Sequence, residues 1–237
     1  MKNKIKFYTT NEGYKVEVIN HIDKKFRVIM FPDGNTKIVE QSSLSKGRVK
    51  NPNHKSVFNV GYIGYGTYKT SLDGNKTECY IIWVNMLLRC YSDKFLSKHP
   101  SYKGTTVAEE WHNFQNFAEW FHKHSNYKLG LELDKDLLVE GNKEYNNISC
   151  RFIPKELNNI IHSGKGVYYD KSNCKFIATC SLGNSRNKFL GRFSTEKEAL
   201  KKYKEVKENY VKQRAEFYKM DIPIEIYKAL INYKISG

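Results

Sequence analysis

Long apolar runs, a signal peptide and paired cysteines are all missing from this sequence. No stretch approaches the roughly 20 apolar residues that a membrane-spanning helix needs. The polar and basic start, Met1–Lys6, also lacks the apolar segment of a signal peptide. The five cysteines include no Cys-x-x-Cys pair, which removes the usual sign of a zinc site and fits a reducing compartment. We therefore expect a cytoplasmic protein that has no membrane partner.

Acidic residues are also scarce, and the charge balance is the strongest signal in the composition. Lys and Arg number 40 against 25 Asp and Glu, so the formal net charge is +15. Such a charge attracts polyanions and speeds encounter with them, which favours a nucleic-acid partner. A solvated, Lys-rich surface is the alternative explanation. Hydrophobic residues make up 40% of the chain, which is enough for a packed core.

The first 57 residues predict a small β-rich module. Alternating or apolar runs at 14–19, 25–31 and 37–39 are typical of short strands. Pro32–Asn35 supplies a turn between the last two runs. The sequence assigns this module no role: it either adds DNA contacts or docks a host protein.

The rest of the chain predicts an α+β fold with three further segments. Residues 58–164 combine helices over 78–91 and 111–123 with a later hairpin and helix. Residues 165–220 combine three strands with a helix that starts at a capping box of Thr195 and Glu198. A short terminal helix occupies 221–237. The expected strands lie at 131–138, 148–153, 166–169, 175–181 and 188–193, and Pro154 starts the helix after the hairpin.

Two strands and a helix can bring polar groups together at one point, and a ββα metal nuclease needs this arrangement. A carboxylate or amide holds a divalent ion, a neighbouring base activates water, and the ion stabilises charge at phosphorus. The segment 133–159 has this layout. Its polar members are Asp134, Lys135, Asp136, Asn142, Ser149, Glu156, Asn158 and Asn159.

This segment resembles the HNH-type (ββα) endonucleases of phages, and the similarity covers about residues 60–163. The resemblance implies Asp134 and Asn158 as catalytic metal ligands, with Mg²⁺ or Mn²⁺ as cofactor. Lys135 stands at the position of the general-base histidine, and Ser149 stands where an asparagine orients that base. A lysine at its ordinary pKa of about 10.4 is a poor base at neutral pH, so Lys135 is either desolvated and basic or holds a phosphate. His162 lies on the helix, where we expect a surface or capping role.

The segment 166–207 resembles an AP2-like DNA-binding domain, a three-stranded sheet packed on one helix. Alternation places Phe176, Ala178 and Cys180 on the buried face of the sheet. The opposite face, with Ile177, would then lie in the DNA major groove, which admits a sheet as well as a helix. The resemblance implies the DNA-binding residues Tyr168, Lys175, Thr179, Ser181, Arg186, Asn187, Lys188, Phe189 and Arg192.

Three functions remain open at this point. The first is a phage-type, homing-like DNA endonuclease, a metal-dependent hydrolase acting in the cytoplasm of an infected bacterial host. The second is a DNA-binding protein on a catalytically degraded nuclease scaffold, acting as a regulator or blocking a host factor. The third is a protein-binding factor whose basic surface meets an acidic partner. Double-stranded DNA is the expected partner in the first two, and a monomer is the default state.

On the helix after Thr195, we expect Lys197, Lys201, Lys202, Lys204 and Lys207 to form a solvated face.

Overall fold

The computed structural model describes all residues except 1–5, 125–129, 165, 183–186 and 236–237. It confirms a mixed α+β fold. Contacts divide the chain into two compact units, which we treat separately. Unit 1 contains residues 1–101 and 109–119, and unit 2 contains residues 102–108 and 120–237.

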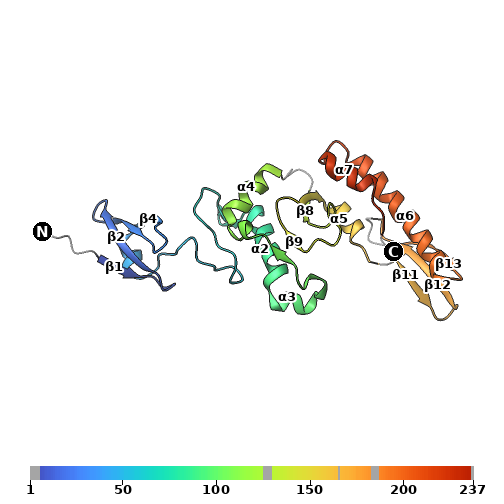
Figure 1. Ribbon diagram of the computed structural model, residues 1–237, viewed down its shortest axis with the longest axis horizontal. Coiled ribbons are helices and arrows are strands. Elements are labelled where there is room, and N and C mark those ends of the chain that lie inside the picture. Colours follow the sequence, from blue (N-terminus) through green and yellow to red (C-terminus); the bar gives the residue numbers. More distant parts are fainter. Residues whose placement is uncertain (1–5, 125–129, 165, 183–186, 236–237) are drawn as a thin grey trace. The chain divides into compact units, whose positions relative to one another are not determined.

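Unit 1 begins with a four-stranded antiparallel meander (Figure 1), in the order β1-β2-β3-β4. The strands β2, β3 and β4 overlap the three predicted runs, and β1 was not among the predicted strands. Helix α1 follows β4 directly and closes the module. The bounds are β1 Lys6–Thr9, β2 Lys15–His21, β3 Phe26–Met30, β4 Thr36–Glu40 and α1 Gln41–Ser45. The core consists of Val16, Ile29, Phe31, Val39, Leu44 and Val49.

The helical part of unit 1 packs around two tryptophans. Trp83 and Trp111 are at most 1% exposed, and the Trp83 indole N–H donates to the Trp111 carbonyl at 2.7 Å. Gly61 lies so close to Trp83 and Leu87 that a Cβ there would come within 2.4 Å of Leu87. The packing of Trp83 and Leu87 therefore requires a glycine at position 61. The bounds are β5 Ser71–Leu72, β6 Asn75–Lys76, α2 Glu78–Tyr91, α3 Asp93–Lys98, η1 Pro100–Tyr102, η2 Glu109–His112 and α4 Phe114–His124, where Tyr102 and residues 120–124 are assigned to unit 2.

Unit 2 contains the predicted hairpin and helix. Strands β8 and β10 pair antiparallel, with Asp134 opposite Arg151, and α5 follows β10 with Pro154 as its N-cap. The first strand ends at Asp134 and does not reach 138. Its carboxylate accepts the backbone N–H groups of Asp136 and Leu137, and this turn bends the chain out of the strand. The bounds are β7 Thr106–Val107, β8 Leu131–Asp134, β9 Glu144–Tyr145, β10 Arg151–Pro154 and α5 Lys155–Ile161, and β7 pairs parallel with β9.

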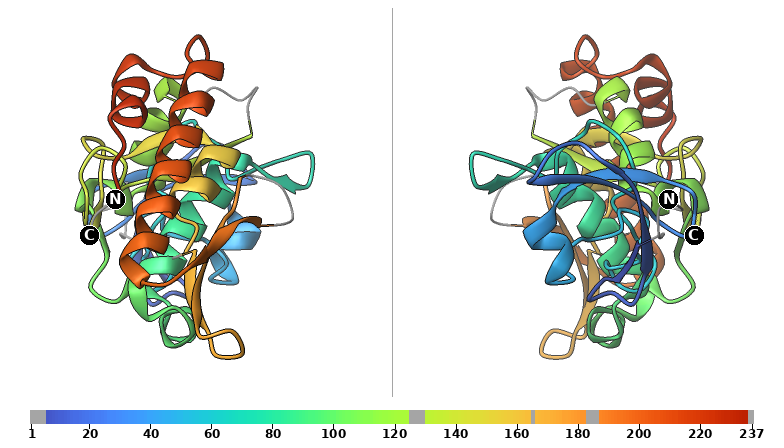
Figure 2. Two further views of the ribbon diagram at one scale, coloured as in Figure 1. Left: turned by 90° about the vertical axis from the view of Figure 1, so that its right-hand side faces the viewer. Right: turned by 90° about the vertical axis from the view of Figure 1, so that its left-hand side faces the viewer.

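The second half of unit 2 is a three-stranded antiparallel sheet followed by two helices. In Figure 1 and Figure 2 the sheet lies beside the N-terminal half of α6, and α7 packs at the other end of α6. The predicted capping box of Thr195 and Glu198 is present. The bounds are β11 Val167–Asp170, β12 Lys175–Cys180, β13 Lys188–Phe193, α6 Glu196–Phe217 and α7 Ile224–Ile231.

One expectation for α6 is wrong. Lys207 does not belong to a solvated face, because it is only 2% exposed. The buried stripe repeats every four residues, and its members are Ala199, Tyr203, Lys207, Val211 and Ala215. Charge alone suggested a solvated side chain, but the helical position of Lys207 places it within this stripe. In the part of the chain that the structure describes, no helix is long and apolar enough to cross a membrane.

Candidate hairpin–helix site and nucleic-acid interface

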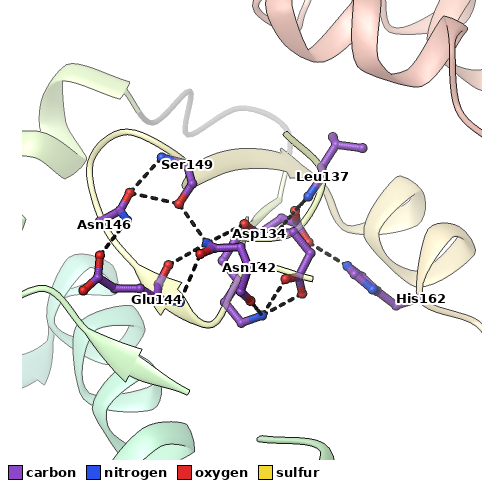
Figure 3. A network of polar contacts seen from close by, with 9 residues as sticks. Asp134, Leu137, Asn142, Glu144, Asn146, Ser149 and His162 are labelled. Atoms are coloured by element: carbon purple, nitrogen blue, oxygen red, sulfur yellow. Dashed lines mark hydrogen bonds and ion pairs between the residues drawn. The ribbon is translucent and has the colours of Figure 1, made fainter. Parts of the chain in front are cut away.

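Asp134 is the centre of the hairpin–helix site. The residue is 5% exposed, and both carboxylate oxygens have partners. Oδ1 accepts the backbone N–H groups of Asp136 and Leu137 at 3.0 and 2.6 Å. Oδ2 lies 2.6 Å from Nε2 of His162 (Figure 3). The buried carboxylate is therefore held in one orientation from two directions.

His162 is the functional candidate that sequence reasoning missed. It follows α5 as the C-cap residue, and we expected only a surface or capping role for it. Its hydrogen bond to Asp134 raises the pKa of the imidazole above its ordinary value of 6.5, opposed by partial burial. The spacing of four residues from Asn158 was the available signal, since residues four apart lie on the same face of a helix.

Lys135 occupies the position where the resemblance expects a general base. It is 8% exposed, and its ammonium donates to both oxygens of Asp136 at 2.6 and 2.8 Å. A third bond, 2.7 Å long, runs to the carbonyl of Asn142. These three acceptors match the three N–H donors of an ammonium. In this arrangement Lys135 supports the loop and is not poised as a base.

The loop between the strands is organised by two asparagines (Figure 3). The Asn142 amide N–H₂ lies within 2.9 Å of the Lys135 carbonyl, the Glu144 carbonyl and the Ser149 hydroxyl. Ser149, at the position of the orienting asparagine, donates in turn to Asn146 Oδ1 at 2.9 Å. The Ser149 hydroxyl therefore bonds to the loop and does not orient His162.

Asn158 does not share a hydrogen bond with Asp134, although the resemblance pairs them as ligands. Its amide N–H₂ donates to Glu132 Oε2 at 2.6 Å. Glu132 and Asp134 lie on one face of β8, and Asn158 and His162 lie on one face of the helix. The result is two adjacent pairs, Glu132 with Asn158 and Asp134 with His162.

The chemistry of these side chains fits a divalent ion in kind. Asn158 Oδ1 is buried and has no hydrogen-bond partner among the described residues, which leaves an amide oxygen available as a ligand. Carboxylate oxygen, imidazole nitrogen and amide oxygen are ligands that Mn²⁺ accepts, whereas Mg²⁺ prefers oxygen throughout. Within the part of the chain that the structure describes, however, no group of three or more His, Cys, Asp or Glu side chains is arranged to hold a metal.

The sheet β11-β12-β13 presents a different kind of surface. Cross-strand pairing places Tyr168, Ile177 and Arg192 in one row, because directly opposed residues point to the same face. After a register shift in β13, Thr179 pairs with Phe189 on that face. Tyr168 and Phe189 are each 54% exposed. We call this face, with its row members and Lys175, the outer face.

The outer face combines cations with exposed rings. Lys175 and Arg192 are exposed, and the Arg192 guanidinium lies 5.5 Å from the centre of the Phe189 ring. Ile177 was expected to face outward and does lie in this row, but it is only 7% exposed, flanked by Tyr168 and Arg192. It therefore supports its neighbours and offers little contact area of its own.

The remaining predicted DNA contacts fall around the outer face. Asn187 and Lys188 are exposed at the start of β13, and Ser181 is half-buried after β12. Lys188 pairs with the buried Cys180, so alternation directs it away from the row of Phe189. Arg186 lies outside the described residues.

Comparisons with known proteins gave no match, so the candidate sites are described from the structure alone. No family model, no curated protein and no solved structure matches this chain.

Proposed function

We propose that this protein binds double-stranded DNA through the outer face of β11–β13. The observation that carries the proposal is the exposed row of Tyr168, Phe189, Lys175 and Arg192 on a sheet whose opposite face is covered by α6. A sheet of this width can enter the major groove of B-DNA. Cations on it would contact phosphates, and the aromatic and polar side chains would meet base edges.

The charge of the chain supports the same proposal. The net charge of +15 gives the protein an attraction for polyanions that is independent of sequence. Lys175 and Arg192 would add to that attraction at the outer face. An acidic protein partner would also be attracted by this charge, whereas the exposed rings on a three-stranded sheet favour DNA.

The direct test is equilibrium binding to a fluorescently labelled duplex at several salt concentrations. Arg192→Ala and Lys175→Ala should each weaken binding and reduce the salt slope by about 1 for a lost phosphate contact. Lys201→Ala is the matched control, because Lys201 is exposed on α6 and lies off the outer face. Equal losses from all three variants would mean that DNA is held by diffuse charge, and the outer face would lose its assignment.

A second candidate function is metal-dependent hydrolysis of DNA at the hairpin–helix site. It is favoured by the Asp134–His162 pair and by the unpartnered Oδ1 of Asn158 on the preceding turn. Asp134 and Asn158 would hold the ion, and His162 would lie beside it. A bound Mg²⁺ or Mn²⁺ would supply charge stabilisation at phosphorus and at the leaving oxygen.

Cleavage of supercoiled DNA separates this candidate from DNA binding alone. Nicking that needs Mg²⁺ or Mn²⁺, stops with EDTA, and is lost in Asp134→Asn but not in the exposed control Asp221→Asn would establish the nuclease, because an amide oxygen at position 134 can still accept the two backbone N–H groups. DNA that is bound but never cut with either metal would leave a regulator or a blocker of a host factor on a degraded nuclease scaffold.

A further inference from the structure

Helix α5 is too short to hold its own position. It has seven residues, and isolated helices below about 12 residues are marginal in water. Yet α5 carries Asn158, and His162 directly follows it, so the geometry of the hairpin–helix site depends on where α5 lies. The contacts that fix α5 therefore decide how that site is oriented.

One end of α5 is held by a buried cation from α6. The Lys207 ammonium donates to the Ile161 carbonyl at 3.4 Å, to the Ser163 carbonyl at 2.9 Å and to the Tyr203 hydroxyl at 3.0 Å. Tyr203 donates its own proton to the Gly164 carbonyl at 3.0 Å. Three acceptors match the three N–H groups of an ammonium, and a cation is favoured at the negative end of a helix.

The other end of α5 is held by the same partner helix. Glu156, in the first turn of α5, accepts from Arg214 at 2.6 Å and from the Tyr218 hydroxyl at 2.9 Å. Between the two ends, Leu157 and Ile160 share a core cluster with Val211, Ala215 and residues of α7, all fully or almost fully buried. Polar contacts at both ends and an apolar contact in the middle leave α5 little freedom to shift.

The N-terminal half of α6 carries the sheet. Tyr203 packs so closely against the residue that precedes β11 that a Cβ on Gly166 would come within 2.6 Å of the ring. Ala199 and Ala178 are fully buried where α6 covers the sheet. Tyr203 therefore contacts the start of the sheet and the end of α5 with one side chain.

We infer that α6 joins the outer face and the Asp134–His162 pair into one rigid body, with Lys207 as the positioning residue. The consequence for DNA, a fixed spacing between contacts, rests on the proposed function. Any contact or cut made by the hairpin–helix site would then fall at a fixed distance from the bases that the outer face binds.

Hydrogen exchange of the free protein tests the rigid body without DNA. In Lys207→Met, the amides of residues 155–164 should exchange at least about tenfold faster, because two carbonyls and a hydroxyl lose a donor. Tyr203→Phe removes a single hydroxyl and should give a smaller effect at the same amides, which keeps the test open if Lys207→Met does not fold. The control Lys201→Met changes an exposed lysine of the same helix and should leave exchange unaltered. Unchanged exchange in both test variants would overturn the inference.

A tethered cleavage reagent tests the fixed distance on DNA. Cys174→Ser removes the exposed cysteine, the other four being buried, and Asn159→Cys places a single reactive thiol on the exposed side of α5. The substrate is a duplex selected for binding from a random pool. An iron chelate on that thiol should cut this duplex within one narrow cluster of positions. Lys207→Met or Tyr203→Phe should widen the cluster of cut positions. Scattered cuts by the parent at full affinity would refute the rigid body. Failure to bind any duplex would reject the proposed function. The exchange experiment would still test whether α6 holds α5 and the sheet as one rigid body.

Discussion

Removing the Asp134 carboxylate should destabilise unit 2 strongly, because this carboxylate is buried and both of its oxygens have hydrogen-bond partners. Two backbone N–H groups donate to Oδ1 of a residue that is 5% exposed. Hydrogen bonds to a charged group contribute about 1.5–3 kcal/mol each, so their joint loss in Asp134→Ala costs about 3 kcal/mol or more. The bond to His162 adds at most about 1 kcal/mol, because that imidazole is 47% exposed and screened by solvent.

The contribution of His162 carries a pH signature with a definite sign. Its pKa is raised in the folded protein, so its contribution is fully present below the unfolded value near 6.5 and is lost as the pH rises through the folded value. Urea unfolding can be followed through the exchange of β8 and β10 amides. The free energy of unfolding should fall more in Asp134→Ala, relative to the parent, at about pH 5.5 than at about pH 9. An equal loss at the two pH values would refute a charged Asp134–His162 pair. His21→Gln, at an exposed histidine of β2, is the control and should change neither value.

Three single contacts give further predictions. In an NMR titration, the His162 imidazole should titrate above 6.5 and fall toward that value in Asp134→Asn, since the carboxylate is the main cause of the shift; an unchanged midpoint would contradict this cause. Thr195→Ala should cost about 1 kcal/mol in thermal unfolding by removing the capping box of α6, whereas Thr195→Ser should retain it. Lys135→Met should lower stability by about 2–4 kcal/mol, because Asp136 and the Asn142 carbonyl lose their common donor; a variant as stable as the parent in urea would show that this network is not stabilising.

The elements of this fold could be predicted where their pattern is local. The helix over 78–91 and the Thr195 capping box depend on residues within a few positions of each other, and both are confirmed. The strand expected to reach 138 stops at 134 because a side chain competes for backbone N–H groups. Apolar alternation contains no information about that competition, so the boundary could not be read from it.

The candidate site was only half predictable for a related reason. Asp134 and Lys135 were identified from the order of residues along the hairpin, but their partners come from other elements. His162 approaches Asp134 from the end of α5, and Lys207 reaches the same helix end from α6. Such meetings across elements depend on tertiary packing. Sequence reasoning therefore assigned both side chains to the solvent, the usual place for charged and titratable groups.

A nuclease differs from a protein that only binds DNA in having a group at the site that can accept a proton from water. A hydrolase of this kind needs a group that can accept a proton from water near the reacting phosphate. Lys135 does not meet this need, because its three N–H groups are bound by Asp136 and the Asn142 carbonyl. His162 has the right chemistry, but its Nε2 is held by Asp134, and that bond stabilises the protonated form. A divalent cation held by Asp134 would compete with this bond, and His162 would then be available as the base. The same pair without a cation is a stable structural contact, so metal affinity, measured before any cleavage assay, separates the nuclease from the DNA-binding protein.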